Sequence, residues 1–145
     1  YFPSYPVSSS TSSDRKYQSI LDFGCGPARI LNDELQSYSK EVVGVDTSDR
    51  IPDRKFDLIV CSSVLEFVPL NRVLKKIRLH LMRGGELIVA SPMDTFLSRL
   101  YFFLIGDKNR RWSHEYIMKV ISKYFFVSEK KEWFGLYFSL RASLK

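Results

Sequence analysis

The sequence predicts an α/β domain with a doubly wound, mostly parallel sheet, and three apolar segments carry that prediction. Residues 19–23 form an apolar run that leads into a glycine turn and a helix-like segment. Residues 41–46 form a second run that ends in Asp46, and residues 56–63 form a third whose centre is apolar throughout. Continuous apolar strands are typical of a parallel sheet that is covered on both faces.

The turn after the first strand has the composition of a nucleotide-binding loop. Its sequence is DFGCG from Asp22 to Gly26, and Gly24 and Gly26 allow a tight turn whose backbone can approach a ligand. The next helix, expected to begin near Ala28, would point its N-terminus at the same place. Asp46 follows Gly26 by about twenty residues at a strand end, where a carboxylate can accept hydrogen bonds from ribose hydroxyls.

Four segments in order resemble the motifs of class I S-adenosylmethionine-dependent methyltransferases of the type 11 kind. They are LDFGCGPAR, VVGVDTS, FDLIVCSSVLEFV and LMRGGELIVASP, which together cover residues 19–92. Residues 114–145 fit the final helix and hairpin of the family more loosely. A nicotinamide-dinucleotide-binding domain is the alternative, but its fingerprint requires a third glycine where this chain has Arg29. The resemblance implies a Rossmann-like methyltransferase domain over residues 19–145, preceded by an extended segment and linker over residues 1–18.

The resemblance also implies where the cofactor, S-adenosyl-L-methionine, binds. It would lie across the carboxyl ends of the strands, with Asp46 on the ribose and Asp49 or Ile51 on the adenine side. No metal is implied. The residues expected to bind the cofactor are Asp22, Gly24, Cys25, Gly26, Asp46, Thr47, Asp49, Cys61, Ser62 and Ser63.

Two residues are candidates for the catalytic base. Glu66 lies where many relatives have Leu-Glu-His, but Phe67 replaces that histidine here, and capping of the next helix is the alternative role for Glu66. His114 opens a predicted helix where relatives that methylate small molecules often carry a histidine. It would serve as a base or position the acceptor, and a contact at the helix N-terminus is its alternative role.

The connection between the second and third strands is too short for the usual unit of this fold. Residues 47–55 would have to hold a crossover helix and a strand, whereas a parallel connection alone needs about a dozen residues. We therefore expect the sheet to lack one strand-helix unit of the usual seven-stranded fold. Alignment of residues 42–56 with the family's third strand is the alternative, but the distance from Gly26 to Asp46 favours the second.

The second half of the chain predicts further helices and strands. Gly84 and Gly85 are expected to end a helix and lead into a strand over residues 86–90. Residues 125–133 and 136–144 predict a closing antiparallel hairpin at the sheet edge. The helix that these glycines would end has an apolar face with three-and-four spacing, which consists of Leu70, Val73, Leu74, Ile77 and Leu81.

An apolar, aromatic-rich segment over residues 96–105 departs most from the family pattern. Three interpretations remain open: a helix that packs on the sheet or replaces the missing layer, the wall of an aromatic or lipid-like acceptor pocket, and a homodimer interface. In the second interpretation Lys108, Arg110 and Arg111 would attract an anionic head group. Phe2 and Tyr5 could likewise cover the cofactor site as a partial lid.

The composition bounds the class of protein. A chain of 145 residues that is 45% hydrophobic can form one domain with a buried core. Two cysteines do not indicate a disulfide framework, so a cytoplasmic location is expected. No apolar run is long enough to span a bilayer and no signal peptide opens the chain, although Tyr1 in place of Met indicates that sequence precedes it. The net charge of +6 is scattered over several helices, which disfavours nucleic acid as a partner.

These features predict a methyltransferase that acts on a small-molecule or lipid-linked acceptor by direct displacement at a sulfonium methyl. Positioning and desolvation can supply much of the rate of such a reaction without a metal. RNA and protein are less favoured acceptors. A non-catalytic module of the same fold, with a binding or regulatory role, is the alternative that the missing unit and the replaced histidine favour.

Overall fold

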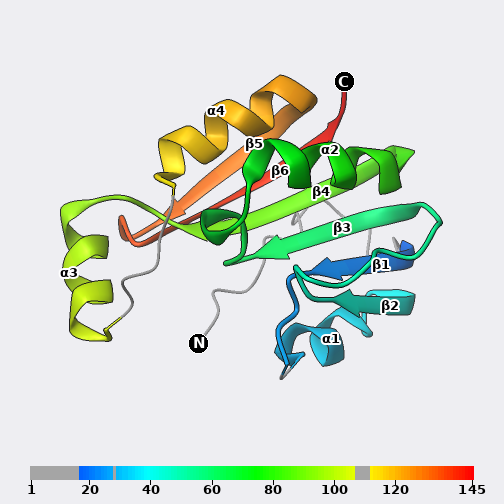
Figure 1. The fold of residues 1–145 in the computed structure, drawn as a ribbon, viewed down its shortest axis with the longest axis horizontal. Coiled ribbons are helices and arrows are strands. Elements are labelled where there is room, and N and C mark those ends of the chain that lie inside the picture. The colour runs from blue at the N-terminus through cyan, green and yellow to red at the C-terminus, as the bar shows by residue number, and fades with distance from the viewer. Residues whose placement is uncertain (1–16, 28, 107–111) are drawn as a thin grey trace.

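A six-stranded sheet forms the centre of the computed structural model, which describes residues 17–27, 29–106 and 112–145 (Figure 1). The strand order is β2-β1-β3-β4-β6-β5. The elements in chain order are β1 (Tyr17–Phe23), α1 (Ile30–Leu35), β2 (Ser39–Val45), β3 (Phe56–Ser62), the 3-10 helix η1 (Leu65–Phe67), α2 (Leu70–His80), β4 (Leu81–Pro92), α3 (Phe96–Leu104), α4 (His114–Tyr124), β5 (Phe125–Trp133) and β6 (Tyr137–Leu144).

The first four strands are parallel and the last two form an antiparallel hairpin. β1 pairs with β2 on one side and β3 on the other, and β3 pairs with β4. β6 pairs antiparallel with both β4 and β5, so the closing hairpin inserts its second strand next to the parallel part of the sheet. The predicted fold class is confirmed. The order reverses between β1 and β3, which is the position where open α/β sheets bind their ligands.

The missing strand-helix unit is also confirmed, because the fully described segment 46–55 contains only turns and bends. The backbone N–H of Asp49 donates to the carbonyl of Asp46 at 3.0 Å, which starts a turn directly after β2. Ile51 is buried in the core and anchors the loop. Arg54 then reaches back to Glu41 of β2, with Nη1 2.8 Å from Oε2 and Nη2 2.7 Å from Oε1. The chain thus returns to the sheet edge without a crossover helix.

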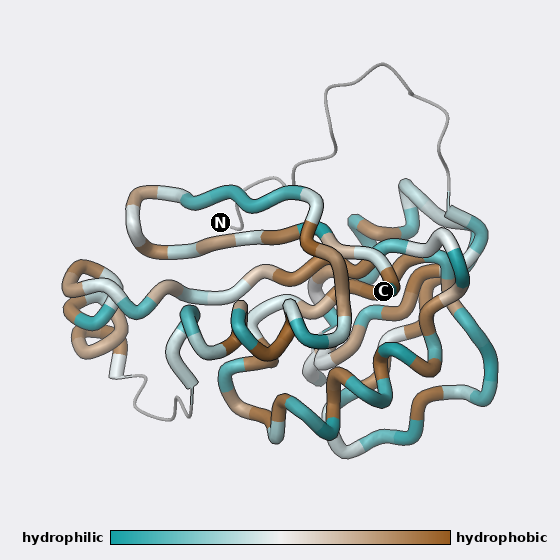
Figure 2. Tube along the Cα trace, turned by 90° about the horizontal axis from the view of Figure 1, so that it is seen from above, coloured by the Kyte–Doolittle hydropathy of each residue, from teal (hydrophilic) through white to brown (hydrophobic). Residues whose placement is uncertain are grey.

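Apolar side chains cover the two faces of the sheet unequally. The larger cluster lies under α2 and α4, where Phe23, Phe56, Ile77 and Phe138 are all fully buried or nearly so. The smaller cluster lies under α1 and includes Ile20, Leu31, Leu35, Leu58 and Val60. Figure 2 shows the hydrophobic stretches that follow the strands through the middle of the molecule. In the described part of the chain, no helix covers the second face over β4, β6 and β5 (Figure 1).

The end of α2 differs from the sequence prediction. The helix ends at His80, and Leu81 already has extended backbone and pairs with Phe56. Gly84 and Gly85 lie inside β4, where the register shifts between the Phe56 and Leu58 pairings. A Cβ at Gly85 would lie 2.9 Å from the carbonyl oxygen of Met82 and 3.0 Å from that of Asp57. The glycines therefore allow a close backbone approach in an irregular strand and do not end the helix.

The segment that the sequence left open forms a helix, α3, which projects beyond the end of the sheet (Figure 1). Only Ser98 and Phe102 are buried in it. The interpretation that it packs on the sheet as a layer is therefore wrong, while the pocket-wall and interface interpretations remain. No helix among the described residues is both long enough and apolar enough to cross a membrane.

Candidate functional site

The residues at the carboxyl ends of the parallel strands lie at one level of the sheet. Phe23 pairs with Val45 of β2 and with Cys61 of β3, so that the next residues, Gly24, Asp46 and Ser62, share one edge. Ser62 pairs with Ala90 of β4, which places Ser63 level with Ser91. The carboxyl ends of β1, β2 and β3 point the same way in Figure 1. The structure thus brings most of the predicted site residues to one edge.

The glycine turn after β1 combines tight packing at one end with open space at the other. Gly24 has φ +81° and its N–H donates to the carbonyl of Val45 at 2.7 Å, and Gly26 has φ +64°. A Cβ at Gly24 would lie 2.4 Å from Cγ2 of Val64, whereas a Cβ at Gly26 would meet nothing within 4 Å. A ligand could therefore lie against the backbone at Gly26. Helix α1 begins only at Ile30, and Ala28 lies outside the described residues.

Asp22 is a buried acid at the base of this turn. It is 1% exposed, and its Oδ2 has no hydrogen-bond partner among the described residues. Burial raises the pKa of the Asp22 carboxyl from 3.8 to about 6. Because an unsatisfied buried oxygen is costly, this arrangement suits a ligand that brings a hydrogen-bond donor or a positive charge.

Two carboxylates organise the turn after β2. The N–H of Thr47 donates to Oδ1 of Asp46 at 2.7 Å, and the N–H of Asp46 donates to Oδ2 of Asp49 at 3.0 Å. Asp46 is half-buried, while Thr47 and Asp49 are exposed at the edge. Ile51, the other candidate for the adenine side, belongs to the core.

Cys25 packs beside the second strand. A Cβ at Gly44 would lie 3.1 Å from Sγ of Cys25 and 2.8 Å from Nδ2 of Asn32. The absence of a side chain at Gly44 therefore lets the turn and α1 approach β2. Burial and then the charge of Asp22 raise the pKa of the Cys25 thiol. The thiol is therefore held in its protonated form at neutral pH.

The end of β3 places three predicted cofactor residues at different depths. Cys61 is fully buried in the larger core cluster, and its burial, together with Asp22, raises the pKa of its thiol. Ser62 and Ser63 are half-buried above it. Ser63 has φ +49° and its N–H donates to the carbonyl of Ala90 at 2.8 Å. The two serines, and not the thiol, therefore lie nearest the open edge.

Glu66 is buried beside the end of β4. It lies in η1, is 2% exposed, and its Oε2 accepts a hydrogen bond from Oγ of Ser91 at 2.9 Å. The N-cap of α2 is Pro69, and no side chain caps that helix. The helix-capping alternative for Glu66 is therefore wrong, whereas a role near the acceptor stays a prediction.

His114 is tied to the chain that leaves β4. Its Nδ1 accepts a hydrogen bond from the backbone N–H of Asp94 at 2.8 Å, and its ring centre is 6.0 Å from that of Phe138. Phe138 pairs with Ser91, which contacts Glu66, so His114 and Glu66 both lie near the carboxyl end of β4. Ser113, whose Oγ accepts from the N–H of Tyr116 at 3.3 Å, caps α4. The cap is thus Ser113, and the contact of His114 with Asp94 bears out its alternative role at the start of the helix, while a role toward the acceptor stays a prediction.

The sequence did not predict the positioning contacts of three residues. Both carboxylate oxygens of Asp57 hold the start of β1, accepting from the N–H groups of Gln18 and Ser19 at 2.7 and 2.8 Å. Ser91 holds Glu66, and Asp94 holds His114 through its backbone. An acid at the start of a strand could have indicated the first of these, but the other two depend on contacts distant in sequence.

The fold is that of a methyltransferase domain. A family model described as a methyltransferase domain matches residues 8–133. The chain belongs to this methyltransferase domain family, and the resemblance to class I S-adenosylmethionine-dependent methyltransferases is confirmed. The comparison with curated proteins found no match.

Several solved structures have the same fold. N-methyltransferase NodS from Bradyrhizobium japonicum WM9, in complex with S-adenosyl-L-homocysteine, is 15% identical with a TM-score of 0.68; the match covers 88% of this chain and 78% of that one. An S-adenosylmethionine-dependent methyltransferase from Mesorhizobium loti is 13% identical with a TM-score of 0.69, over 88% and 91% of the two chains. Human N-acetylserotonin methyltransferase in complex with SAM is 15% identical with a TM-score of 0.67, over 92% of this chain and 49% of that one.

Proposed function

We propose that the protein binds S-adenosyl-L-methionine at the carboxyl edge of β1 and β2 and transfers its methyl group to a small-molecule or lipid-linked acceptor over β3 and β4. One observation carries the proposal. The unsatisfied buried carboxylate oxygen of Asp22 lies beneath a glycine turn that has open space at Gly26, at the point where the strand order reverses.

The residues of this edge fit the parts of such a cofactor. In our proposal the backbone at Gly24, Cys25 and Gly26 lies against the cofactor, and Asp22 meets its positively charged amino group. Asp46 accepts hydrogen bonds from the ribose, with Thr47 and Asp49 on the adenine side. Ser62 and Ser63 lie toward the methionine part. The level pairing of β1 with β2 and β3 supports this order along the edge.

The proposed acceptor side has two polar groups with different hydrogen-bonding roles. When bound, the cofactor supplies a methyl group activated by a positively charged sulfur. Glu66, held by Ser91, can accept a proton or a hydrogen bond from the acceptor. His114 already accepts a hydrogen bond at Nδ1, so its neutral ring carries its proton on Nε2. It is therefore a hydrogen-bond donor that positions the acceptor, and Glu66 is the better candidate for the base.

Calorimetry with S-adenosylmethionine and S-adenosylhomocysteine tests the cofactor part of this proposal. We expect both to bind wild-type protein, and Gly26→Ala to weaken both. If neither compound binds the wild type, the domain has the methyltransferase fold without a working cofactor site. A screen of small and lipid-linked acceptors with a cofactor carrying a radioactive methyl group then tests turnover.

The occupied Nδ1 of His114 also favours a second candidate function. A fold that binds the cofactor with no histidine available as a base could serve as a non-catalytic binding or regulatory module. Binding of the cofactor without labelled product from any acceptor class would support that function over catalysis.

A further inference from the structure

We propose that α3 and the turn between β5 and β6 dock the protein on the surface of an anionic lipid membrane. We call this surface the apolar tip. Its most exposed residues are Phe134 at 88%, Phe96 at 82%, Leu104 at 73% and Phe103 at 69%. Its other members, all exposed, are Leu97, Leu100, Tyr101 and Ile105. Single exposed apolar residues are normal, but a contiguous group of this size marks an interaction site.

The apolar tip is held firmly on the body of the protein. Oγ1 of Thr95 donates to the carbonyl of Gly135 at 2.5 Å and accepts from the N–H of Ser98 at 3.1 Å. The N–H of Met93 donates to the carbonyl of Leu136 at 2.8 Å. Phe102 is buried, with its ring centre 6.1 Å from that of Tyr137. These contacts join α3 to the hairpin turn, so the exposed side chains are presented by a fixed support.

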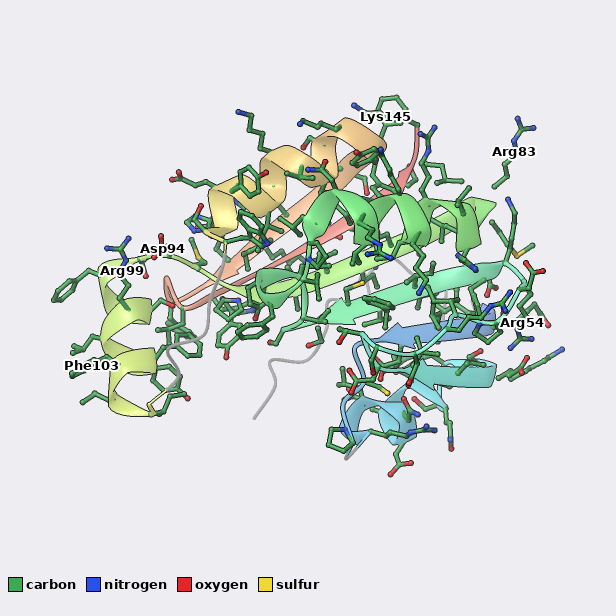
Figure 3. The ribbon with its side chains drawn as sticks, in the orientation of Figure 1. Arg54, Arg83, Asp94, Arg99, Phe103 and Lys145 are labelled. Carbon is green, nitrogen blue, oxygen red and sulfur yellow. The ribbon has the colours of Figure 1, made fainter. Side chains whose placement is uncertain are left out.

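The shape of the tip suits a lipid phase. Exposed apolar residues cover one broad side of α3, whereas Ser98 and Phe102 face inward. The helix stands clear of the sheet in Figure 1, and Phe103 points away from the body in Figure 3. A convex apolar projection can enter the soft boundary of a membrane, where Phe and Leu side chains gain free energy by burial. A protein partner would need a matching hollow.

The charge of the chain selects an anionic surface over a second copy of the protein. The net charge is +6, so two copies repel each other while an anionic leaflet attracts the chain. Helix α3 contains no acidic residue, and its one cation, Arg99, has its Nε 2.7 Å from Oδ1 of Asp94 (Figure 3).

Docking would turn the proposed acceptor edge toward the membrane, because α3 begins four residues after the end of β4 at Pro92. This consequence rests on the proposed function and points to a lipid-linked acceptor. The docking itself does not rest on it, since membrane binding can be measured without methyl transfer.

The test is cosedimentation of the full chain with vesicles of phosphatidylcholine alone or mixed equally with phosphatidylserine. We expect binding to the mixed vesicles that weakens with added salt, and little binding to phosphatidylcholine alone. Phe103→Ser combined with Leu104→Ser should lower the partition coefficient at least about tenfold, as expected for lost burial of two large apolar side chains. Leu79→Ser is the matched control, because Leu79 is 70% exposed on α2, away from the tip.

Two measurements keep the outcome interpretable. Circular dichroism and the urea midpoint should be unchanged in the double variant, because both side chains are exposed, and a Phe103→Trp reporter should shift its emission to the blue on vesicle binding. Absence of binding to anionic vesicles, or binding that the double variant leaves unchanged, would overturn the proposal. So would a dimer in sedimentation velocity that the double variant abolishes. Calorimetry with the cofactor reports on the proposed function separately.

Discussion

The backbone N–H of Asp94 donates a 2.8 Å hydrogen bond to Nδ1 of His114 and so ties the end of β4 to the start of α4. The carboxylate of the same Asp94 holds Arg99 of α3, with Nη2 3.1 Å from Oδ2. One residue thus connects the end of β4, the first turn of α4 and the apolar tip. Because a backbone N–H can only donate, the contact also sets which nitrogen of the neutral ring carries the proton.

We propose that His114 positions the acceptor as a donor from Nε2. His114→Ala should therefore lower kcat/KM for the acceptor about 10- to 100-fold while leaving the Kd of the cofactor unchanged. His114→Gln places an amide donor near the same point and should recover part of the loss. The pH–rate profile of His114→Gln should match that of the wild type. If the wild-type profile shows an inflection that both variants lack, His114 is the base instead.

Asp22 should make the free energy of unfolding depend on pH. Its pKa is raised from 3.8 to about 6 by burial, so the folded protein holds this proton more tightly than the unfolded chain. The contribution of this group is therefore most favourable below pH 3.8 and is lost as the pH rises toward about 6. A shift of this size corresponds to roughly 3 kcal/mol.

Asp22→Asn should remove this penalty and raise the free energy of unfolding above pH 6 by about 1 to 3 kcal/mol in the absence of cofactor. The same change should weaken binding of S-adenosylmethionine, and wild-type affinity should increase as the pH rises through about 6. Urea unfolding and calorimetry on either side of that pH measure both effects. A variant that is less stable than the wild type at neutral pH, with unchanged affinity, would show a structural role for the carboxylate.

Chain length and local pattern predicted the sheet well. The apolar runs at residues 19–23, 41–46 and 56–63 became neighbouring parallel strands, and the short segment after Asp46 correctly predicted the missing unit. Both inferences depend on constraints that act within a few residues: side-chain burial and the reach of a short connection. The position of the glycine turn directly after β1 followed for the same reason.

Features that depend on distant contacts could not be predicted. Pairing of Leu81 with Phe56 extends β4 toward α2, and no local signal outweighs the glycines that suggested a helix end. Apolar composition left packing on the sheet open for residues 96–105, whereas hydrogen bonds from Thr95 to Gly135 and from Met93 to Leu136 fix the start of α3 on the hairpin turn. Likewise, a histidine at position 114 suggested a base, whereas the N–H that occupies its Nδ1 comes from a residue twenty positions earlier.

Asp46→Ala should weaken S-adenosylmethionine binding by roughly 1.5 to 3 kcal/mol, the range for lost charge-assisted hydrogen bonds. This corresponds to about a 10- to 150-fold higher Kd by calorimetry. Asp53→Ala is the control, since Asp53 is an exposed acid of the same loop. An unchanged Kd for Asp46→Ala would move the ribose contact to another acid, and Asp49 would be the next to test.

Alanine at the two glycines of the turn should separate packing from binding. Gly24→Ala places a Cβ 2.4 Å from Cγ2 and 2.7 Å from Cβ of Val64 at a φ of +81°, so overpacking adds to left-handed strain. We expect it to lower the free energy of unfolding by about 2 to 5 kcal/mol. In Gly26→Ala the new Cβ meets open space. The free energy of unfolding should therefore fall by only about 1 to 2 kcal/mol, the cost of a left-handed backbone at a residue with a side chain.

The cofactor affinity of Gly26→Ala should nevertheless fall by more than its small loss of unfolding free energy would explain. The reason is that the new methyl group would occupy the space where we place the cofactor. Urea unfolding and calorimetry on the same samples compare the two effects, at temperatures where both variants are folded. If Gly26→Ala binds S-adenosylmethionine with the wild-type Kd, the open side of this turn is not the cofactor cradle. The unsatisfied oxygen of Asp22 would then require a different partner.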